Sequence, residues 1–282
     1  MKKTILLFLG LAVGFMADAQ TQVKTPALSP KAVTAQTVGL TNFEVAYSRP
    51  SLKGRELFGG IIRENELWRF GANENTTISF DTPIKFNGTN VKPGTYAMFA
   101  TPSKNEWVIH LYDNTKNWGT PKKLERKLIV AEVRIPVQKL DNKVETFTIS
   151  FDNLATNDFI MNIAWENSNV AIKVELPTRE LTVESIKEVM AAKPTEPDFF
   201  RSASYFLNEE IELESALEYM NKAIDLKGDA PAYYIYTKAL ILKKLNKTDE
   251  AMKAAEETIQ AAKKQNYDEY ARKGEALLKE LK

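Results

Sequence analysis

FTISFDNLATNDFIMNIAWENSNVAIKVEL, residues 147–176, alternates apolar and polar side chains along most of its length. Large apolar residues recur at every second position in three stripes, at 147–151, 159–165 and 170–176. A period of two predicts β-strands with one buried face. Pro177 follows at once, and beyond it the apolar residues recur with the period of a helix. The stretch therefore predicts a β domain that ends at residue 177 and a helical domain that begins at residue 178.

The same alternation runs through the chain upstream of this stretch, from residue 39 onward. Apolar stripes occur at 43–47, 78–80, 107–111 and 129–135. Asn87-Gly88 is typical of a tight hairpin, and Pro93-Gly94 marks another turn between apolar runs. About nine short strands joined by short turns predict an antiparallel β-sandwich or open barrel over residues 39–177.

Residues 178–282 carry a helical pattern that repeats at an offset of 35 residues. The matched pairs include Ala216 with Ala251, Ala223 with Thr258, Ser204 with Ala239 and Leu207 with Leu242. Two helices per unit at this period resemble the tetratricopeptide repeat, although its early Trp and its Leu-Gly pair are missing. The resemblance implies helical hairpins that contact a protein partner. A further helix, over residues 182–192 and capped by Thr182, is predicted to precede them.

The first residues have the pattern of a secretory signal. Two lysines at positions 2 and 3 precede an apolar run over residues 5–16, and Ala17-Asp18-Ala19 then fits a small-x-small cleavage site. The run is shorter than the about 20 residues that a spanning helix needs, and the absence of cysteine excludes a lipoprotein anchor. We expect a signal peptide over residues 1–19, a periplasmic or secreted protein with no transmembrane segment, and a flexible lead-in over residues 20–38.

Charge and composition exclude several classes of function. The 38 basic and 37 acidic side chains give a net charge of +1, which provides no long-range field for nucleic acid or an anionic membrane. The chain has no cysteine and one histidine, His110, which excludes Cys-ligated metals and any site that needs two histidines. Oxygen ligands alone could still hold a metal, but no calcium-loop spacing is present, and we expect no metal site and no cofactor. No Gly-x-Ser-x-Gly elbow is present to use His110 as a base, and we interpret it as a half-exposed structural residue.

The stretch 43–77, FEVAYSRPSLKGRELFGGIIRENELWRFGANENTT, is the candidate site, because it combines polar and aromatic residues in loops. Guanidinium groups bind carboxylates and phosphates in a bidentate manner, and indole rings offer a platform for a sugar. The competing interpretation pairs each arginine with a local acid. We expect Arg49, Arg55 and Arg69 to gather near Trp68 and Asn73. The predicted ligand-binding residues are Arg49, Arg55, Trp68, Arg69, Asn73, Glu74 and Trp118.

Several motifs in one order resemble a single bacterial family. They are Tyr47-Ser48-Arg49-Pro50-Ser51, Lys53-Gly54-Arg55, Trp68-Arg69, Gly71-Ala72-Asn73-Glu74, Pro93-Gly94-Thr95-Tyr96 and Trp118-Gly119. This set resembles the domain of unknown function 2911, over roughly residues 24–176. The family has no agreed activity, so the resemblance implies only a β-rich domain and a secreted setting.

The leading functional hypothesis is a non-catalytic binding module. It would hold a small anionic or sugar ligand at residues 49–74 and contact a protein through the helical repeats. One alternative is a hydrolase-like enzyme at the same cluster, in which Glu74 with Asp81 or Asp113 would form a carboxylate pair. Another is a purely structural envelope protein. A closed pocket with a perturbed acid beside the arginines would favour the enzyme, and an open face would favour binding.

Overall fold

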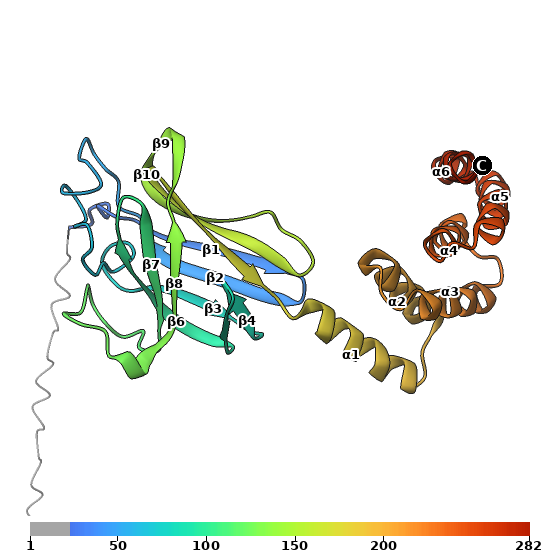
Figure 1. The fold of residues 1–282 in the computed structure, drawn as a ribbon, viewed down its shortest axis with the longest axis horizontal. Coiled ribbons are helices and arrows are strands. Elements are labelled where there is room, and N and C mark those ends of the chain that lie inside the picture. The colour runs from blue at the N-terminus through green and yellow to red at the C-terminus, as the bar shows by residue number, and fades with distance from the viewer. Residues whose placement is uncertain (1–22) are drawn as a thin grey trace, which may run out of the picture. The chain divides into compact units, whose positions relative to one another are not determined.

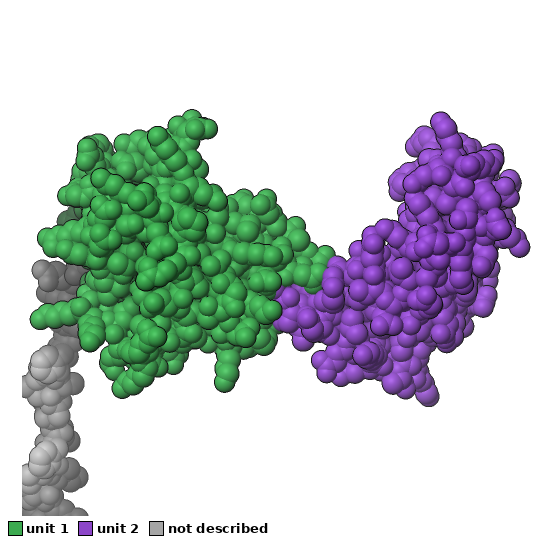
Figure 2. All heavy atoms as spheres, in the orientation of Figure 1, with its two compact units in different colours: residues 1–175 green, residues 176–282 purple. Residues whose placement is uncertain are grey.

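The computed structural model describes residues 23–282, so the predicted signal peptide lies outside the described residues. The chain divides into two compact units, the first ending at Glu175 and the second beginning at Leu176 (Figure 2). The first unit holds two antiparallel sheets and the second holds six helices (Figure 1). The predicted class, a β-sheet region followed by a helical region, is confirmed. No helix among residues 23–282 is long and apolar enough to cross a membrane.

The larger sheet has six strands in the order β1-β2-β3-β6-β7-β8. These strands are β1 (Lys31–Val38), β2 (Thr41–Ser48), β3 (Thr76–Phe80), β6 (Gly94–Pro102), β7 (Glu106–Tyr112) and β8 (Ile129–Pro136). A short 3-10 turn, Arg126–Leu128, leads into β8. Neighbours in this sheet follow one another in the chain except where β3 pairs with β6, so most of its contacts are made by successive antiparallel strands.

The smaller sheet has four strands in the order β5-β4-β10-β9. They are β4 (Ile84–Phe86), β5 (Thr89–Val91), β9 (Gln138–Asp152) and β10 (Asp158–Glu175). The predicted Asn87-Gly88 hairpin joins β4 to β5, and both turn residues have positive φ, 45° and 81°. The stripes at 159–165 and 170–176 belong to one long strand, because the irregularity around Glu166 shifts the register without reversing the chain.

The first described strand corrects the predicted flexible lead-in over residues 20–38. Lys31–Val38 pairs residue for residue with β2, from Lys31 opposite Ser48 to Val38 opposite Thr41. This strand lies at the edge of the sheet, and its sequence KAVTAQTV has no stripe of large apolar residues. Backbone pairing with β2 therefore forms the strand where the hydrophobic pattern gives little signal.

Large aromatic side chains form the centre of the β unit. Trp107 and Trp165 are 1% and 0% exposed and lie in the core. The Trp68 ring stacks on that of Trp165 with centroids 5.8 Å apart, and meets Trp107 and Phe147 edge-on at 5.7 and 5.3 Å. Offset and edge-on arrangements of this kind are the favourable geometries for aromatic pairs.

Six helices make up the second unit. They are α1 (Thr178–Ala191), α2 (Glu196–Glu209), α3 (Leu213–Lys227), α4 (Ala232–Lys244), α5 (Thr248–Lys264) and α6 (Asp268–Leu281). The first helix begins at Thr178, four residues before the predicted Thr182 cap. Pro177 stands directly before that first turn, where its missing N–H and fixed φ suit the start of a helix. Ile186 of α1 packs in one apolar cluster with Phe199 and Phe206 of α2.

Small residues lie at the contacts between the helices. Four of the matched positions are fully buried, at 0% exposure: Ala216, Ala223, Ala239 and Ala251. Ser204 is only partly buried, and the fully buried residue of α2 is its neighbour Ala203. The predicted match of Ser204 with Ala239 is therefore one residue out of register.

The connections between helices explain this shift. The α2–α3 connection contains two left-handed residues, Glu210 and Glu212, with φ of 53° and 45°. The α4–α5 connection contains one, Asn246, with φ of 58°. Each connection has three residues, but the left-handed residue comes directly after α2, at Glu210, and one residue later after α4, at Asn246. The offset is therefore 36 residues from Glu210 to Asn246, whereas it is 35 residues from the start of α3 at Leu213 to the start of α5 at Thr248. Sequence matching at a single fixed offset cannot detect such a difference.

Candidate functional site

A depression of ≈ 730 Å³ opens beside the segment that the sequence analysis selected. Its lining comes from residues 28–29, from many positions between 50 and 73, and from Thr120. Four cationic side chains line it, and Glu66 supplies the only carboxylate of the lining. The cations are Lys53, Arg55, Arg63 and Arg69. We call this feature the arginine depression.

Arg69 lies between two buried aromatic residues. Trp68 and Phe70 are 8% and 0% exposed, and Arg69 between them is half-buried. Its guanidinium group has no hydrogen bond or ion pair among the described residues, which leaves its donors available in the depression. A Cβ atom at Gly119 would lie 3.5 Å from Arg69 Nη1, so Gly119 lies beside the guanidinium group.

The wall of the depression after Arg69 holds a strained backbone. Phe70 and Asn73 have φ of 57° and 62°, values that L-residues seldom adopt. Gly71 has φ of 139°, and a Cβ there would lie 2.9 Å from the Ser48 carbonyl oxygen, closer than side chains approach. The hydroxyl of Thr76 donates a hydrogen bond to the carbonyl of Phe70 and holds this conformation. Strained segments of this kind concentrate at functional sites.

The other two predicted arginines bind the protein's own backbone. Arg49 donates from Nε to the Phe147 carbonyl at 3.0 Å and from Nη2 to Thr148 Oγ1 at 2.7 Å. Arg55 donates to the carbonyls of Leu52 and Ser51, both at 2.9 Å. Arg49 therefore links the end of β2 to β9 through hydrogen bonds. Arg55 stabilises the loop that contains it by binding the carbonyls of Ser51 and Leu52.

The competing interpretation, in which each arginine pairs with a local acid, is wrong for these three residues. Among the described residues, Glu66 pairs with Arg63 at 3.4 Å, and Glu74 pairs with Lys31 at 2.7 Å. Glu64 accepts a hydrogen bond from the Lys104 backbone at 3.1 Å. These three acids have other partners, and Arg69 has none among the described residues.

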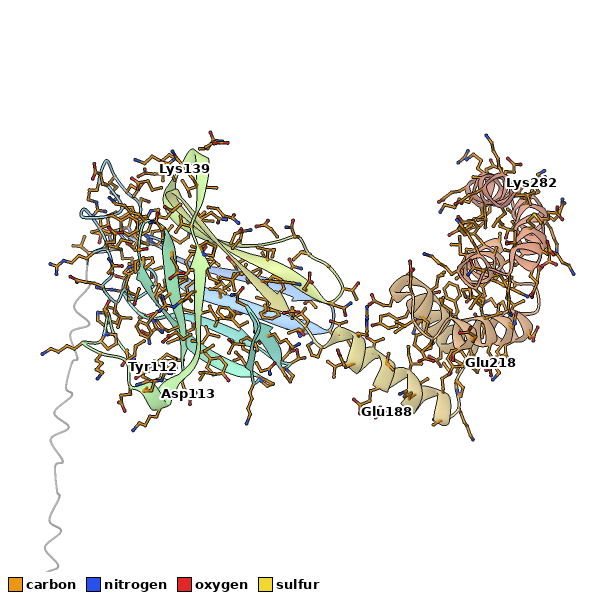
Figure 3. All side chains as sticks on the ribbon, viewed as in Figure 1. Tyr112, Asp113, Lys139, Glu188, Glu218 and Lys282 are labelled. Atoms are coloured by element: carbon orange, nitrogen blue, oxygen red, sulfur yellow. The ribbon has the colours of Figure 1, made fainter. Side chains whose placement is uncertain are left out.

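The structure brings together part of the predicted site. Arg55, Trp68, Arg69 and Asn73 line the arginine depression, whereas Arg49 does not. The remaining two predicted residues, Glu74 and Trp118, line a neighbouring depression. Figure 3 labels Tyr112 and Asp113 at the end of β7, where the segment that carries Trp118 begins.

Trp68 does not provide the exposed platform that the sequence analysis expected. Its ring packs against four aromatic side chains in the core, and its backbone pairs with Ala100 of β6 at 2.7 and 3.0 Å. The pairing places this residue on the inward side of an extended segment. Lys53 and Arg63 also line the depression but were not predicted from the sequence. The density of cationic residues between positions 53 and 69 could have indicated them.

His110 is buried, at 7% exposure, so its interpretation as half-exposed is wrong. It occupies β7, with Nδ1 at 3.4 Å from Glu132 Oε2. Burial lowers the pKa of this imidazole below 6.5, with Arg134 acting in the same direction and Glu132 opposing them. Among residues 23–282, no group of three or more His, Asp or Glu side chains is placed to hold a metal ion.

The fold and the site define a class of protein: an antiparallel β-sandwich with a cationic depression at a strained loop, followed by a helical unit. Residues 29–174, just over half of the chain, match the family described as protein of unknown function (DUF2911). The chain belongs to this family. No curated protein and no solved structure matches it.

Proposed function

We propose that the β unit binds a small anionic ligand in the arginine depression and performs no reaction on it. The excess of cations over carboxylates in the lining supports an anionic ligand, because opposite charges attract strongly in a concave site. A volume of ≈ 730 Å³ is within the range of small-molecule sites, which run from about 300 to 1,000 Å³.

The observation that carries this proposal is the unpartnered guanidinium of Arg69. A half-buried guanidinium has lost part of its hydration, and a carboxylate or phosphate would satisfy two of its donors at once. The backbone that carries it is held by the buried side chains of Trp68 and Phe70 on either side. A preordered group of this kind favours binding, since little conformational freedom is lost when the ligand arrives.

The lining supports a binding role better than hydrolysis. General acid–base chemistry on a glycoside requires two carboxyl groups on either side of the scissile bond. The depression offers Glu66, which pairs with Arg63 at 3.4 Å. Glu74, the other acid expected there, lies in the neighbouring depression and pairs with Lys31.

Calorimetric titration of the whole chain with citrate and with inorganic phosphate tests this proposal. Arg69→Ala is expected to weaken binding of the better probe by about 1.5 to 3 kcal/mol, the scale of a hydrogen bond to a charged group. Arg201→Ala is the matched control, because Arg201 is an exposed arginine on α2 of the other unit. The proposal would be refuted if the two variants lost equal binding affinity, or if the unaltered protein bound neither anion.

We further propose that the helical unit is a tetratricopeptide-like module that contacts a protein. Helices α2 with α3 and α4 with α5 pack as successive hairpins, and α6 packs on α5. Partly buried aromatic side chains connect the first helices of these hairpins: Tyr233 of α4 contacts Phe200 of α2 and Tyr270 of α6, with centroids 5.4 and 6.0 Å apart. Aromatic residues of this type are enriched in protein interfaces.

A photo-crosslinking residue placed at Tyr233 would test the helical proposal in the native host. We expect one discrete crosslinked species from this position, and none from the exposed Glu188 of α1. The same pattern of products from both positions would argue against a dedicated surface.

Export to the periplasm or beyond is a third proposal, supported by the leader pattern of residues 1–19. Mass spectrometry of the protein from its host is expected to show Gln20 as the first residue. An intact Met1 terminus would contradict it.

A further inference from the structure

A second depression, of ≈ 420 Å³, lies on the face of the six-stranded sheet. It is lined by β1, β2, the start of β3 and the segment 115–118. A backbone pairing separates it from the arginine depression: Glu74 bridges to Trp118, and Gly119 donates to the Asn73 carbonyl at 3.2 Å. Asn73 lines one depression and Glu74 lines the other. We call the second feature the tryptophan depression.

Trp118 presents an uncovered indole at this depression. Its side chain is 72% exposed, which is unusual for the largest apolar residue of a loop. The bridge to Glu74 fixes the backbone that carries it. Val33 of β1, 60% exposed, lines the same depression and adds apolar surface. The depression thus combines a flat aromatic surface with a β-sheet floor.

Asn75 is the second, independent observation. Its side chain lines the tryptophan depression and is 8% exposed. Neither its amide nitrogen nor its amide oxygen has a hydrogen-bond partner among the described residues. An unsatisfied buried polar group costs about 1 to 3 kcal/mol, and nearly all buried polar groups have a partner in native proteins. A ligand at this position would supply that partner.

The charges of the tryptophan depression differ from those of the arginine depression. Lys31 and Glu74 neutralise each other through an ion pair of 2.7 Å. The remaining polar side chains of the lining are mostly neutral, with Lys116 as the exception. No excess of unpaired cations comparable to that around Arg69 is present in this lining. The site is therefore suited to an uncharged ligand that can both donate and accept hydrogen bonds.

We propose that the tryptophan depression binds a neutral pyranose sugar, with the apolar face of the ring on Trp118. A sugar hydroxyl both donates and accepts, which matches an amide that has a free donor and a free acceptor. Both amide atoms lie beneath the surface, so the Asn75 side chain must turn toward the depression for a sugar hydroxyl to reach them. Thr115 and Asn117 provide further polar groups at the rim.

Saturation-transfer difference NMR on the whole chain tests the proposal. The probes are methyl β-glucopyranoside, methyl β-galactopyranoside and methyl α-mannopyranoside, with glucuronate as a charged comparison. At least one neutral glycoside is expected to receive saturation, strongest at the protons of one ring face. Trp118→Ala is expected to weaken its binding about tenfold or more, the loss of one well-placed ring contact. The exposed position of Trp118 means that the variant keeps its fold.

Asn75→Leu separates a binding role from a structural one. Leu has nearly the shape of Asn and removes an unsatisfied amide, so the melting temperature is expected to stay or rise while sugar binding is lost. Arg69→Ala is expected to keep sugar binding, which distinguishes this site from the anion site. The proposal is overturned if no neutral glycoside receives saturation, if Trp118→Ala binds as well as the unaltered protein, or if Asn75→Leu melts earlier and still binds sugar.

Discussion

The β unit and the helical unit fill their interiors in opposite ways. The largest fully buried side chains all belong to the β unit and include Trp107, Trp165 and Phe147. In the helical unit, the fully buried positions are mostly alanines, such as Ala216 and Ala251. Two stacked sheets lie about 10 Å apart and need large side chains between them. Paired helices approach most closely where their contact residues are small.

The comparison teaches which changes each unit tolerates. A core of large side chains is damaged when a side chain is shortened, because the space cannot collapse completely. A contact between alanines is damaged when a side chain is enlarged, because neither backbone can move away without losing other contacts. Each unit should therefore be sensitive to the substitution that the other resists.

Trp165→Ala would test the first half of the comparison. Trp165 is 0% exposed and also donates from Nε1 to the Glu145 carbonyl at 3.3 Å. We expect the unfolding free energy of the β unit to fall by about 3 to 5 kcal/mol. Denaturant titration followed by tryptophan fluorescence measures this unit alone, since all four tryptophans lie in it.

Trp118→Ala is the matched control for that experiment. Trp118 is 72% exposed, and its loss should change the unfolding free energy by less than about 0.5 kcal/mol. If the two variants lost comparable unfolding free energy, burial would not determine the effect of shortening a side chain. The expected sensitivity of the β unit to shortened core residues would then be wrong.

Ala216→Leu would test the second half. Ala216 is 0% exposed in the cluster that also holds Met220 and Phe206. The longer side chain should overpack this contact and lower the unfolding free energy of the helical unit by about 1 to 3 kcal/mol. Far-UV circular dichroism during denaturation provides the measurement. The same change at Ala191, exposed at the end of α1, should have little effect. If Ala216→Leu is as harmless as Ala191→Leu, the alanine contacts are loose.

His110→Gln should have the smallest effect on the unfolding free energy. It tests whether the stability of the β unit depends on pH in a way that the stability of the helical unit does not. Burial depresses the pKa of His110 in the folded state below 6.5, so on acidification the unfolded chain takes up this proton first. The contribution of neutral His110 to stability is present above pH 6.5 and is lost as pH falls from 6.5 toward the folded pKa.

The β unit should therefore lose stability over this pH range, and His110→Gln should remove part of that dependence. The helical unit contains no histidine and serves as the internal reference. Melting curves of both proteins on either side of pH 6.5 give the measurement. A pH dependence that is unchanged by the substitution would assign the effect to other groups.

Strong periodicity made the larger part of the fold predictable. The alternating stripe at 159–165 identified a strand because large apolar residues on one face have few other arrangements. Lys31–Val38 escaped prediction because an edge strand of small and polar residues is set by its partner's backbone. The repeating helical pattern was visible in the sequence, but the left-handed residues Glu210 and Asn246 that end α2 and α4 lie 36 residues apart, one more than the offset of 35.

The candidate site was predicted as a region and not as an arrangement. Trp68 and Arg69 are adjacent in sequence, and only the three-dimensional pairing with Ala100 shows that Trp68 faces the core while Arg69 lines the depression. Composition could not separate these roles, because loops carry no period. Asn75 gave no signal at all, since an unsatisfied amide is defined by partners that come from distant segments.

The position of β10 in the smaller sheet has a consequence for the order of folding. This strand pairs with β9 on one side and with β4 on the other, where Val174 lies opposite Phe86, about 90 residues earlier in the chain. The six-stranded sheet can grow by local hairpins as the polypeptide emerges, but the apolar face of its strands is not fully covered until β9 and β10 arrive. Closure of the sandwich is thus a late, non-local and slow event, and it is during this interval that the nascent β unit most needs protection from aggregation.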